Sequence, residues 1–167
     1  MSEIIDNELE MAEDTQKGKF LTFTLGTEVY GIEIKHVTEI IGMQPVTQVP
    51  DLPEYVKGII NLRGKIIPVI DVRLRFKKSA VEYNDRTCIV VVDIQEIAVG
   101  LIVDTVVEVL TIAENDIVPP PQLQNGSYHQ RFIKAIGKVG DDVKLILDSD
   151  RVLSNDEVNS LGKINGV

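Results

Sequence analysis

The chain has 167 residues and a formal net charge of −9 at pH 7, and 44% of its residues are hydrophobic. The acidic balance argues against a nucleic-acid backbone or an anionic membrane surface as partner, because both attract clustered Lys and Arg. The single cysteine, Cys88, rules out an intrachain disulfide and favours a reducing compartment. No stretch reaches the roughly 18 apolar residues of a membrane span. The acidic N-terminus is unlike a signal peptide, so we expect a cytoplasmic protein.

The first third of the chain predicts a tail followed by three strands. Residues 1–18 hold six acidic side chains and are expected to be a solvated tail. Residues 19–25 and 29–34 alternate β-forming residues around Gly26 and Thr27, which predicts a hairpin. A single turn is expected at residues 35–37, before a third strand at residues 38–43. The three prolines of residues 44–53 predict a loop, because proline cannot donate to a sheet ladder.

The rest of the chain also predicts short strands joined by tight turns. Residues 55–57 predict one helical turn, and residues 58–62 and 65–71 predict strands joined at Arg63 and Gly64, where Gly64 supplies the positive φ of a hairpin turn. Residues 72–81 form a basic connector. Strands are then expected at residues 87–93, 97–103, 106–112, 132–139 and 143–147, with turns at residues 95–96 and 140–142 and a loop at residues 119–128. A capping box from Ser154 to Glu157 opens a short helix at residues 158–161.

The two halves of the chain repeat one pattern. Shifted by 69 positions, residues 20–50 align with residues 89–119, and with a shift of 77, residues 57–71 align with residues 134–148. The paired positions include Gly31 and Gly100, Val37 and Val106, Glu39 and Glu108, and Asp71 and Asp148. We therefore expect two similar barrel or sandwich units at residues 19–82 and 83–150, with a helix and tail at residues 151–167. Units this small are marginal alone, so they should share a core.

The sequence contains no constellation typical of an enzyme. Residues 58–66 are spaced one residue too long for a phosphate-binding loop and lack its Ser or Thr. His36 and His129 have no partner at metal-ligand spacing. Asp71 and Asp148 end strands, where a carboxylate typically caps a turn. We expect a binding module without catalytic residues, metal or cofactor. The alternative hypothesis is a barrel-type small-ligand-binding or regulatory subunit whose site lies between the barrels.

Several segments resemble the CheW-type chemotaxis coupling proteins. They are residues 18–40, 57–73, 83–85 and 99–104, and the turn from Asn61 to Gly64 followed by Pro68 and Asp71 is the most specific of them. The resemblance extends from residue 18 to the end of the chain. It implies an all-β fold of two five-stranded SH3-like barrels with a shared core and a short C-terminal helix. It also implies a scaffold that couples the cytoplasmic hairpin tips of chemoreceptors to the regulatory domain of the histidine kinase CheA, in arrays at the membrane.

The resemblance further implies which residues contact these partners. The receptor hairpin would lie in the groove between the barrels, in a helix-in-groove mode. Val37 and Val106 would supply apolar contact, Glu39 and Arg63 would fix register through charge, and Gly58 and Gly100 would permit close backbone approach. The implied receptor-binding set is Val37, Glu39, Gly58, Arg63, Gly100 and Val106. Val46 and Leu123, in Pro-rich loops, are expected to contact the kinase.

Overall fold

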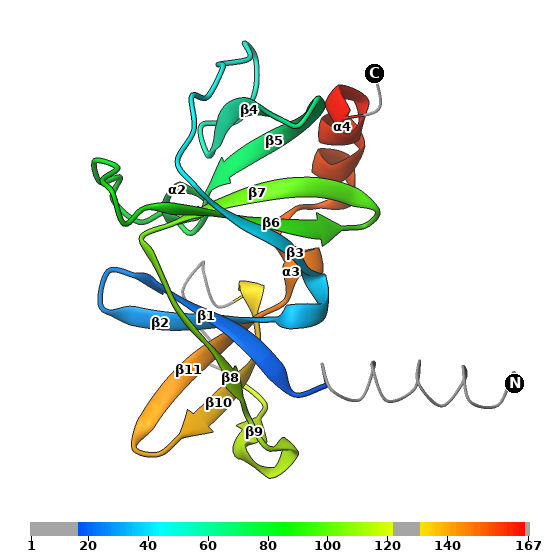
Figure 1. The fold of residues 1–167 in the computed structure, drawn as a ribbon. Helices are drawn as coiled ribbons and strands as arrows, with labels where there is room; N and C mark the ends of the chain where they lie inside the picture. The colour runs from blue at the N-terminus through cyan, green and yellow to red at the C-terminus, as the bar shows by residue number, and fades with distance from the viewer. Residues whose placement is uncertain (1–16, 122–130, 166–167) are drawn as a thin grey trace, which may run out of the picture.

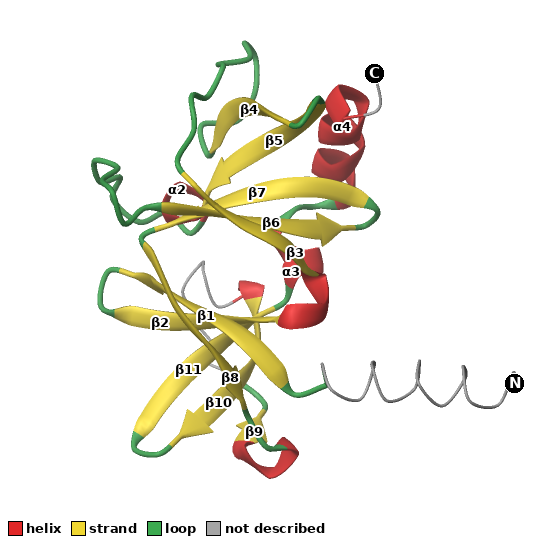
Figure 2. Ribbon diagram, in the orientation of Figure 1, coloured by secondary structure: helices red, strands yellow, loops and turns green. Residues whose placement is uncertain are grey.

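The computed structural model describes residues 17–121 and 131–165, which fold almost entirely as β-structure (Figure 2). The short helical elements are η1 (Ile34–His36), α2 (Val72–Arg75), η2 (Glu114–Asp116), α3 (Ser149–Val152) and α4 (Asn155–Asn165). The strands are β1 (Lys19–Leu25), β2 (Glu28–Glu33), β3 (Val37–Gly42), β4 (Val56–Leu62), β5 (Lys65–Asp71), β6 (Cys88–Ile94), β7 (Ile97–Val103), β8 (Thr105–Thr111), β9 (Ile117–Val118), β10 (Ile133–Val139) and β11 (Asp142–Leu147). The expected all-β class with a short C-terminal helix is confirmed.

The strands form two sheets, each curled around its own apolar interior, and Figure 1 shows one above the other. The five-stranded barrel has the order β3-β6-β7-β5-β4, and the six-stranded barrel has the order β8-β1-β2-β11-β10-β9. Each contains one parallel pair, β5 with β7 and β2 with β11, among antiparallel neighbours. The expected count of five strands therefore holds for one barrel. The other gains β9, which pairs with β10 through Ile117 and Val118.

The expected division of the chain into barrels at residues 19–82 and 83–150 is wrong. The five-stranded barrel uses the continuous run β3 to β7, whereas the six-stranded barrel takes β1 and β2 from before that run and β8 to β11 from after it. The connections explain this arrangement. Only Asp104 separates β7 from β8, which is too short for a hairpin turn, so β8 continues into the other barrel. The three residues of η1 connect β2 of the six-stranded barrel to β3 of the five-stranded barrel.

The repeat itself is confirmed and explains how the barrels are related. β6 begins and ends 69 positions after β1, and β10 and α3 begin and end 77 positions after β4 and α2. The pairings repeat as well, because β1 pairs with β8 while its equivalent β6 pairs with β3. Each barrel therefore combines the first hairpin of one repeat with the later strands of the other repeat. The two repeats exchange strands around an approximate two-fold axis.

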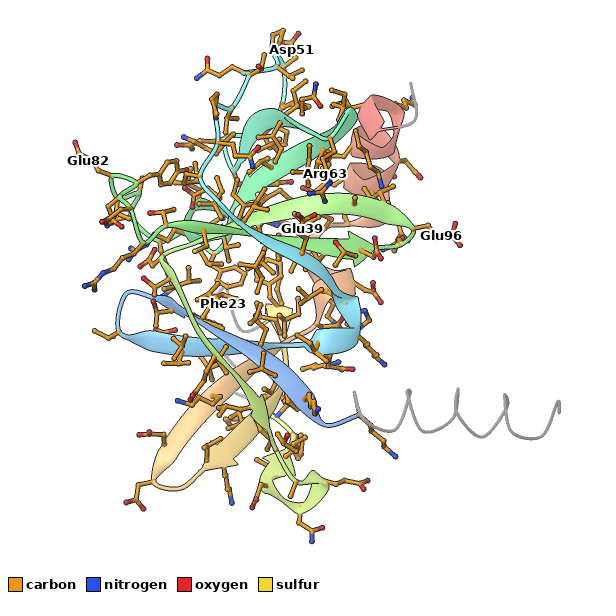
Figure 3. All side chains as sticks on the ribbon, viewed as in Figure 1. Phe23, Glu39, Asp51, Arg63, Glu82 and Glu96 are labelled. Carbon is orange, nitrogen blue, oxygen red and sulfur yellow. The ribbon has the colours of Figure 1, made fainter. Side chains whose placement is uncertain are left out.

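Three apolar clusters follow from the alternation of side chains along these strands. The largest lies between the barrels, includes Leu21 and Phe23 of β1, and is the shared core that the sequence predicts. Figure 3 shows Phe23 at this junction. The five-stranded barrel is filled by residues such as Val69 and Ile89, and the six-stranded barrel by residues such as Phe20. Each half thus buries one face in its own barrel and the other against its neighbour.

Arg75, at the end of α2, is a buried charged residue that connects both repeats to the C-terminal helix. Its side chain is 8% exposed, and its guanidinium lies 4.5 Å from the ring centroid of Tyr55 and 5.1 Å from that of Phe132. Those two aromatic residues are 77 positions apart and therefore equivalent. Arg75 Nε donates to the Val152 carbonyl oxygen at 2.6 Å, and Nη2 lies 3.1 Å from Glu157 Oε1 on α4.

Local predictions are mostly confirmed, with two corrections. Asp71 accepts a hydrogen bond from the Leu74 amide and caps α2, and Asp148 caps α3 in the same way, so both carboxylates have the expected capping role. The capping box of Ser154 is also confirmed. The predicted helical turn at residues 55–57 is wrong, because β4 begins at residue 56. The basic connector at residues 72–81 begins with α2.

Candidate protein-binding surface

Val37 and Val106 occupy equivalent positions at the starts of the two strands that cross between the barrels. Val37 on β3 lies opposite Val92, and Val106 on β8 lies opposite Phe23; both partners belong to the shared core. Val37 and Val106 are half-buried and pack against that core. In Figure 1, β3 crosses over the five-stranded barrel and β8 over the six-stranded barrel on the viewer's side. Both repeats therefore present a valine next to the barrel junction.

Ile40 and Val109 extend this apolar surface and were not singled out as contacts from the sequence. They lie opposite Val90 and Leu21 of the shared core, on the same faces of β3 and β8 as Val37 and Val106. Ile40 is 43% exposed and Val109 is 51% exposed. We name Val37, Ile40, Val106 and Val109 the junction strip. The alignment of residues 40–41 with residues 109–110 was the available signal, but it could not show which member of each pair faces outward.

Glu39 and Arg63 form a two-pronged ion pair within the chain. Arg63 Nη1 donates to Glu39 Oε1 at 2.9 Å, and Nη2 donates to Oε2. Figure 3 shows the two side chains pointing toward one another. Glu39 is on β3 and Arg63 is in the β4–β5 turn, so the pair joins the two edge strands of the five-stranded barrel. The carboxylate that Arg63 holds in the free chain is therefore an internal one.

The ion pair lies at the surface and contributes little to the stability of the fold. The Arg63 side chain is 71% exposed and that of Glu39 is 28% exposed, and exposed pairs are screened by solvent. The hydrogen bond from Arg63 is the main cause that lowers the pKa of Glu39, so this carboxylate stays ionised into acidic solution. Arg63 also has a φ of 53°, a backbone conformation that residues with a Cβ rarely adopt. Strained backbone of this kind is typical of functional positions.

Gly58 and Gly100 are buried and allow close packing within the chain. A Cβ at Gly100 would come within 2.8 Å of Ile89 Cγ2 and 3.5 Å of Val69 Cγ2 inside the five-stranded barrel. A Cβ at Gly58, whose φ is 148°, would collide with the Thr47 carbonyl oxygen. Both residues do permit close approach, as expected, but the approaching groups are internal. Neither glycine is exposed to a partner, so an effect of Gly58 or Gly100 on binding would come from the backbone shape of β4 or β7.

Of the two expected kinase contacts, Val46 lies within the described residues. Val46 is half-buried in the β3–β4 loop and packs against the interior of the five-stranded barrel. Leu123 lies outside the described residues. The structure therefore places Val37 and Val106 at equivalent positions of the two repeats and joins Glu39 to Arg63.

The described residues offer little for metal chemistry or membrane insertion. Within residues 17–121 and 131–165, no group of three or more His, Cys, Asp and Glu side chains could hold a metal ion. In the same part of the chain, no helix has the length and apolar character needed to cross a membrane.

Comparison with known proteins agrees with this architecture. The family model described as "CheW-like domain" matches residues 19–157. The chemotaxis protein CheW of Klebsiella aerogenes is 35% identical over 148 residues, which cover 89% of each chain. That of Treponema pallidum is 32% identical over 158 residues, 92% of each chain. A crystal structure of the scaffolding protein TtCheW from Thermoanaerobacter tengcongensis matches with a TM-score of 0.73 and 40% identity, over 78% of this chain and 88% of that one. The chain therefore belongs to the CheW-like family of chemotaxis scaffold proteins.

Proposed function

We propose that this chain is a non-catalytic adaptor that couples chemoreceptor cytoplasmic hairpins to the regulatory domain of the histidine kinase CheA. It would act in the cytoplasm and be recruited to receptor arrays at the membrane. The observation that carries the proposal is the junction strip, in which Ile40 and Val109 stay exposed beside the shared core. Large apolar side chains that stay exposed beside a core are candidates for a protein-binding surface. The receptor helix would lie along this strip.

The polar part of the receptor site would be the pair of Glu39 and Arg63. Because the two side chains bind each other in the free chain, a receptor either reads the pair as a unit or competes for one member. The two glycines, Gly58 and Gly100, would shape the strands that carry the site. The kinase would contact the chain elsewhere, at Val46 and Leu123, so that both partners can bind at once.

The first experiment compares two lysine substitutions of similar exposure. Val109→Lys places a charge on the junction strip, and Val81→Lys places one in the connector, where Val81 is 46% exposed. Affinity is measured for a receptor cytoplasmic fragment and for the kinase regulatory domain, with melting temperature as a check on folding. Val109→Lys should weaken receptor binding about tenfold or more, because a buried charge without a partner is costly in an interface. Equal effects of the two variants would contradict the assignment.

The second experiment tests the role of the ion pair. Exchanging the charges with Glu39→Arg and Arg63→Glu keeps an internal ion pair but reverses its direction. Receptor binding should fall if the receptor reads the charges, with the melting temperature nearly unchanged. Glu39→Lys alone should also weaken binding, through repulsion and the loss of steering. Full receptor binding by the exchanged variant would show that the ion pair only links β3 to the β4–β5 turn and is not read by the receptor.

A further inference from the structure

The approximate two-fold axis places Glu108 in the six-stranded barrel where Glu39 lies in the five-stranded barrel. Glu39 lies opposite Val91, and Glu108 lies opposite Thr22. Glu108 follows Glu39 by 69 positions and Val91 follows Thr22 by 69 positions, so the two cross-strand pairs are equivalent. The turn that carries Arg63 is likewise repeated 77 positions later at Gly140. The backbone conformation is kept, with a φ of 53° at Arg63 and 61° at Gly140.

The second copy of this site has the carboxylate but no guanidinium. Position 140 is glycine, and the two residues after it are Asp141 and Asp142, where the first copy has Gly64 and Lys65. No described residue forms an ion pair with the Glu108 carboxylate, and Thr22 bonds only its backbone groups. At these positions the first copy has one acidic and two basic residues, Glu39, Arg63 and Lys65, and the second copy has three acidic residues, Glu108, Asp141 and Asp142.

Exposed apolar residues flank Glu108 on both sides. Val107 and Val109 are each 51% exposed. Val107 is the extra residue of a β-bulge, since Val106 lies opposite Phe23 and Glu108 lies opposite its neighbour Thr22. The equivalent bulge residue in the first copy is Thr38, a polar residue whose hydroxyl donates to the Val91 carbonyl oxygen. Glu108 and Val109 point to opposite faces of β8, because successive strand side chains alternate, but β8 is an edge strand, so a partner that lies along this edge can meet both the carboxylate and the apolar side chains.

We propose that Glu108 binds an arginine of the chemoreceptor hairpin, so that the partner supplies the guanidinium which Arg63 supplies to Glu39 within the chain. The inference deepens the proposed function and rests on it. The receptor is the expected source because Val109 belongs to the junction strip, on the same strand as Glu108. The internal pair shows the geometry, a two-pronged contact in which both guanidinium nitrogens donate to one carboxylate.

Two variants of the full-length chain test the proposal. Glu108→Gln keeps the size of the side chain and removes its charge. The second variant grafts the first turn onto the second, with Gly140→Arg, Asp141→Gly and Asp142→Lys together, and supplies Glu108 with an internal arginine. A Cβ at Gly140 meets no atom within 4 Å, and arginine is already tolerated at the equivalent φ, so the graft should fold.

The probes are a receptor cytoplasmic hairpin fragment and the kinase regulatory domain. Both variants should weaken receptor binding roughly threefold to tenfold, as expected for a partly exposed charged contact, and leave kinase binding unchanged. Glu108→Gln within the graft should lose nothing further toward the receptor, because the graft has already occupied that carboxylate. Each arginine of the receptor hairpin is then changed to alanine. The arginine that binds Glu108 is the one whose loss weakens binding to the unaltered chain but not to Glu108→Gln.

Unchanged receptor binding by Glu108→Gln would overturn the proposal, and so would a loss confined to kinase binding. In either case, weakened receptor binding by Val109→Lys would leave the proposed function intact. Failure of the unaltered chain to bind the receptor fragment would refute the proposed function and this inference together.

Discussion

Replacing Arg75 by methionine should destabilise the whole chain, because this one side chain contacts both repeats and α4. Methionine fills a similar volume and can keep contact with the rings of Tyr55 and Phe132 through its sulfur. It cannot replace the hydrogen bond to the Val152 carbonyl or the contact with Glu157. The change therefore removes the polar bonds of Arg75 with little loss of packing.

The size of the effect can be worked from those contacts. The carbonyl of Val152 would lose its partner in a buried place, at a cost of about 1–3 kcal/mol. The loss at Glu157 is smaller, since its side chain is 23% exposed and also accepts from the Ser154 amide. Removing a buried charge recovers part of its desolvation cost. We expect a net loss of about 2–3 kcal/mol, which corresponds to a fall in melting temperature of roughly 5–10 °C.

Urea unfolding at pH 7 gives the measurement, with Arg86→Met as the control, because Arg86 is exposed in the turn before β6. Glu157→Gln should cost less than Arg75→Met, because the amide oxygen can still accept from Arg75 and Ser154. A loss below about 0.5 kcal/mol for Arg75→Met, equal to that of the control, would show that the buried guanidinium does not hold the two repeats and α4 together.

Three further predictions concern stability. Tyr55→Phe should raise stability by about 1 kcal/mol, because the buried Tyr55 hydroxyl has no hydrogen-bond partner among the described residues and the equivalent residue is already phenylalanine; a lower melting temperature would contradict this. Glu96→Gly should stabilise the β6–β7 turn by about 0.5 kcal/mol, since Glu96 has a φ of 73°, and Glu96→Ala should give no such gain. Asp104→Asn should cost more stability at pH 7 than at pH 3. The hydrogen bond from Arg73 is the main cause that lowers the pKa of Asp104, so its stabilisation is complete above the ordinary value of 3.8 and is lost as pH falls through the lower folded value. Equal losses in urea unfolding at the two pH values would count against that ion pair.

Strand positions could be predicted because each strand alternates β-forming residues and is bounded by a turn or a proline. The repeat could also be predicted, since Gly31 and Gly100 require glycine for the same reason: a Cβ at either would press on a residue of an adjacent strand. The assignment of strands to barrels could not be predicted. It depends on whether a connection such as Asp104 lets a strand turn back, and hydrophobic pattern alone carries no information on pairing partners.

The candidate site was predictable in part. Val37 and Val106 were found through the repeat and the family resemblance, but the neighbouring Ile40 and Val109 required the register of β3 and β8. The pairing of Glu39 with Arg63 joins edge strand β3 to the turn that follows edge strand β4, and these two strands are not hydrogen-bonded to each other. The family resemblance implied a receptor partner for each, and only the fold showed that the two are partners of one another.

The continuous run of the five-stranded barrel has a consequence for synthesis on the ribosome. All strands of that barrel have been made once residue 103 has emerged, whereas the six-stranded barrel waits for β11, which ends at residue 147. Until then β2 lacks its parallel partner, and the apolar side chains of β1 lack part of their cover. The five-stranded barrel should therefore form first. The six-stranded barrel should close last, because its β2–β11 pairing joins residues more than 100 positions apart, and such long-range pairing is slow. Limited proteolysis of ribosome-bound chains in which residue 103 has just left the exit tunnel should find β3 to β7 protected and β1 and β2 still cleaved.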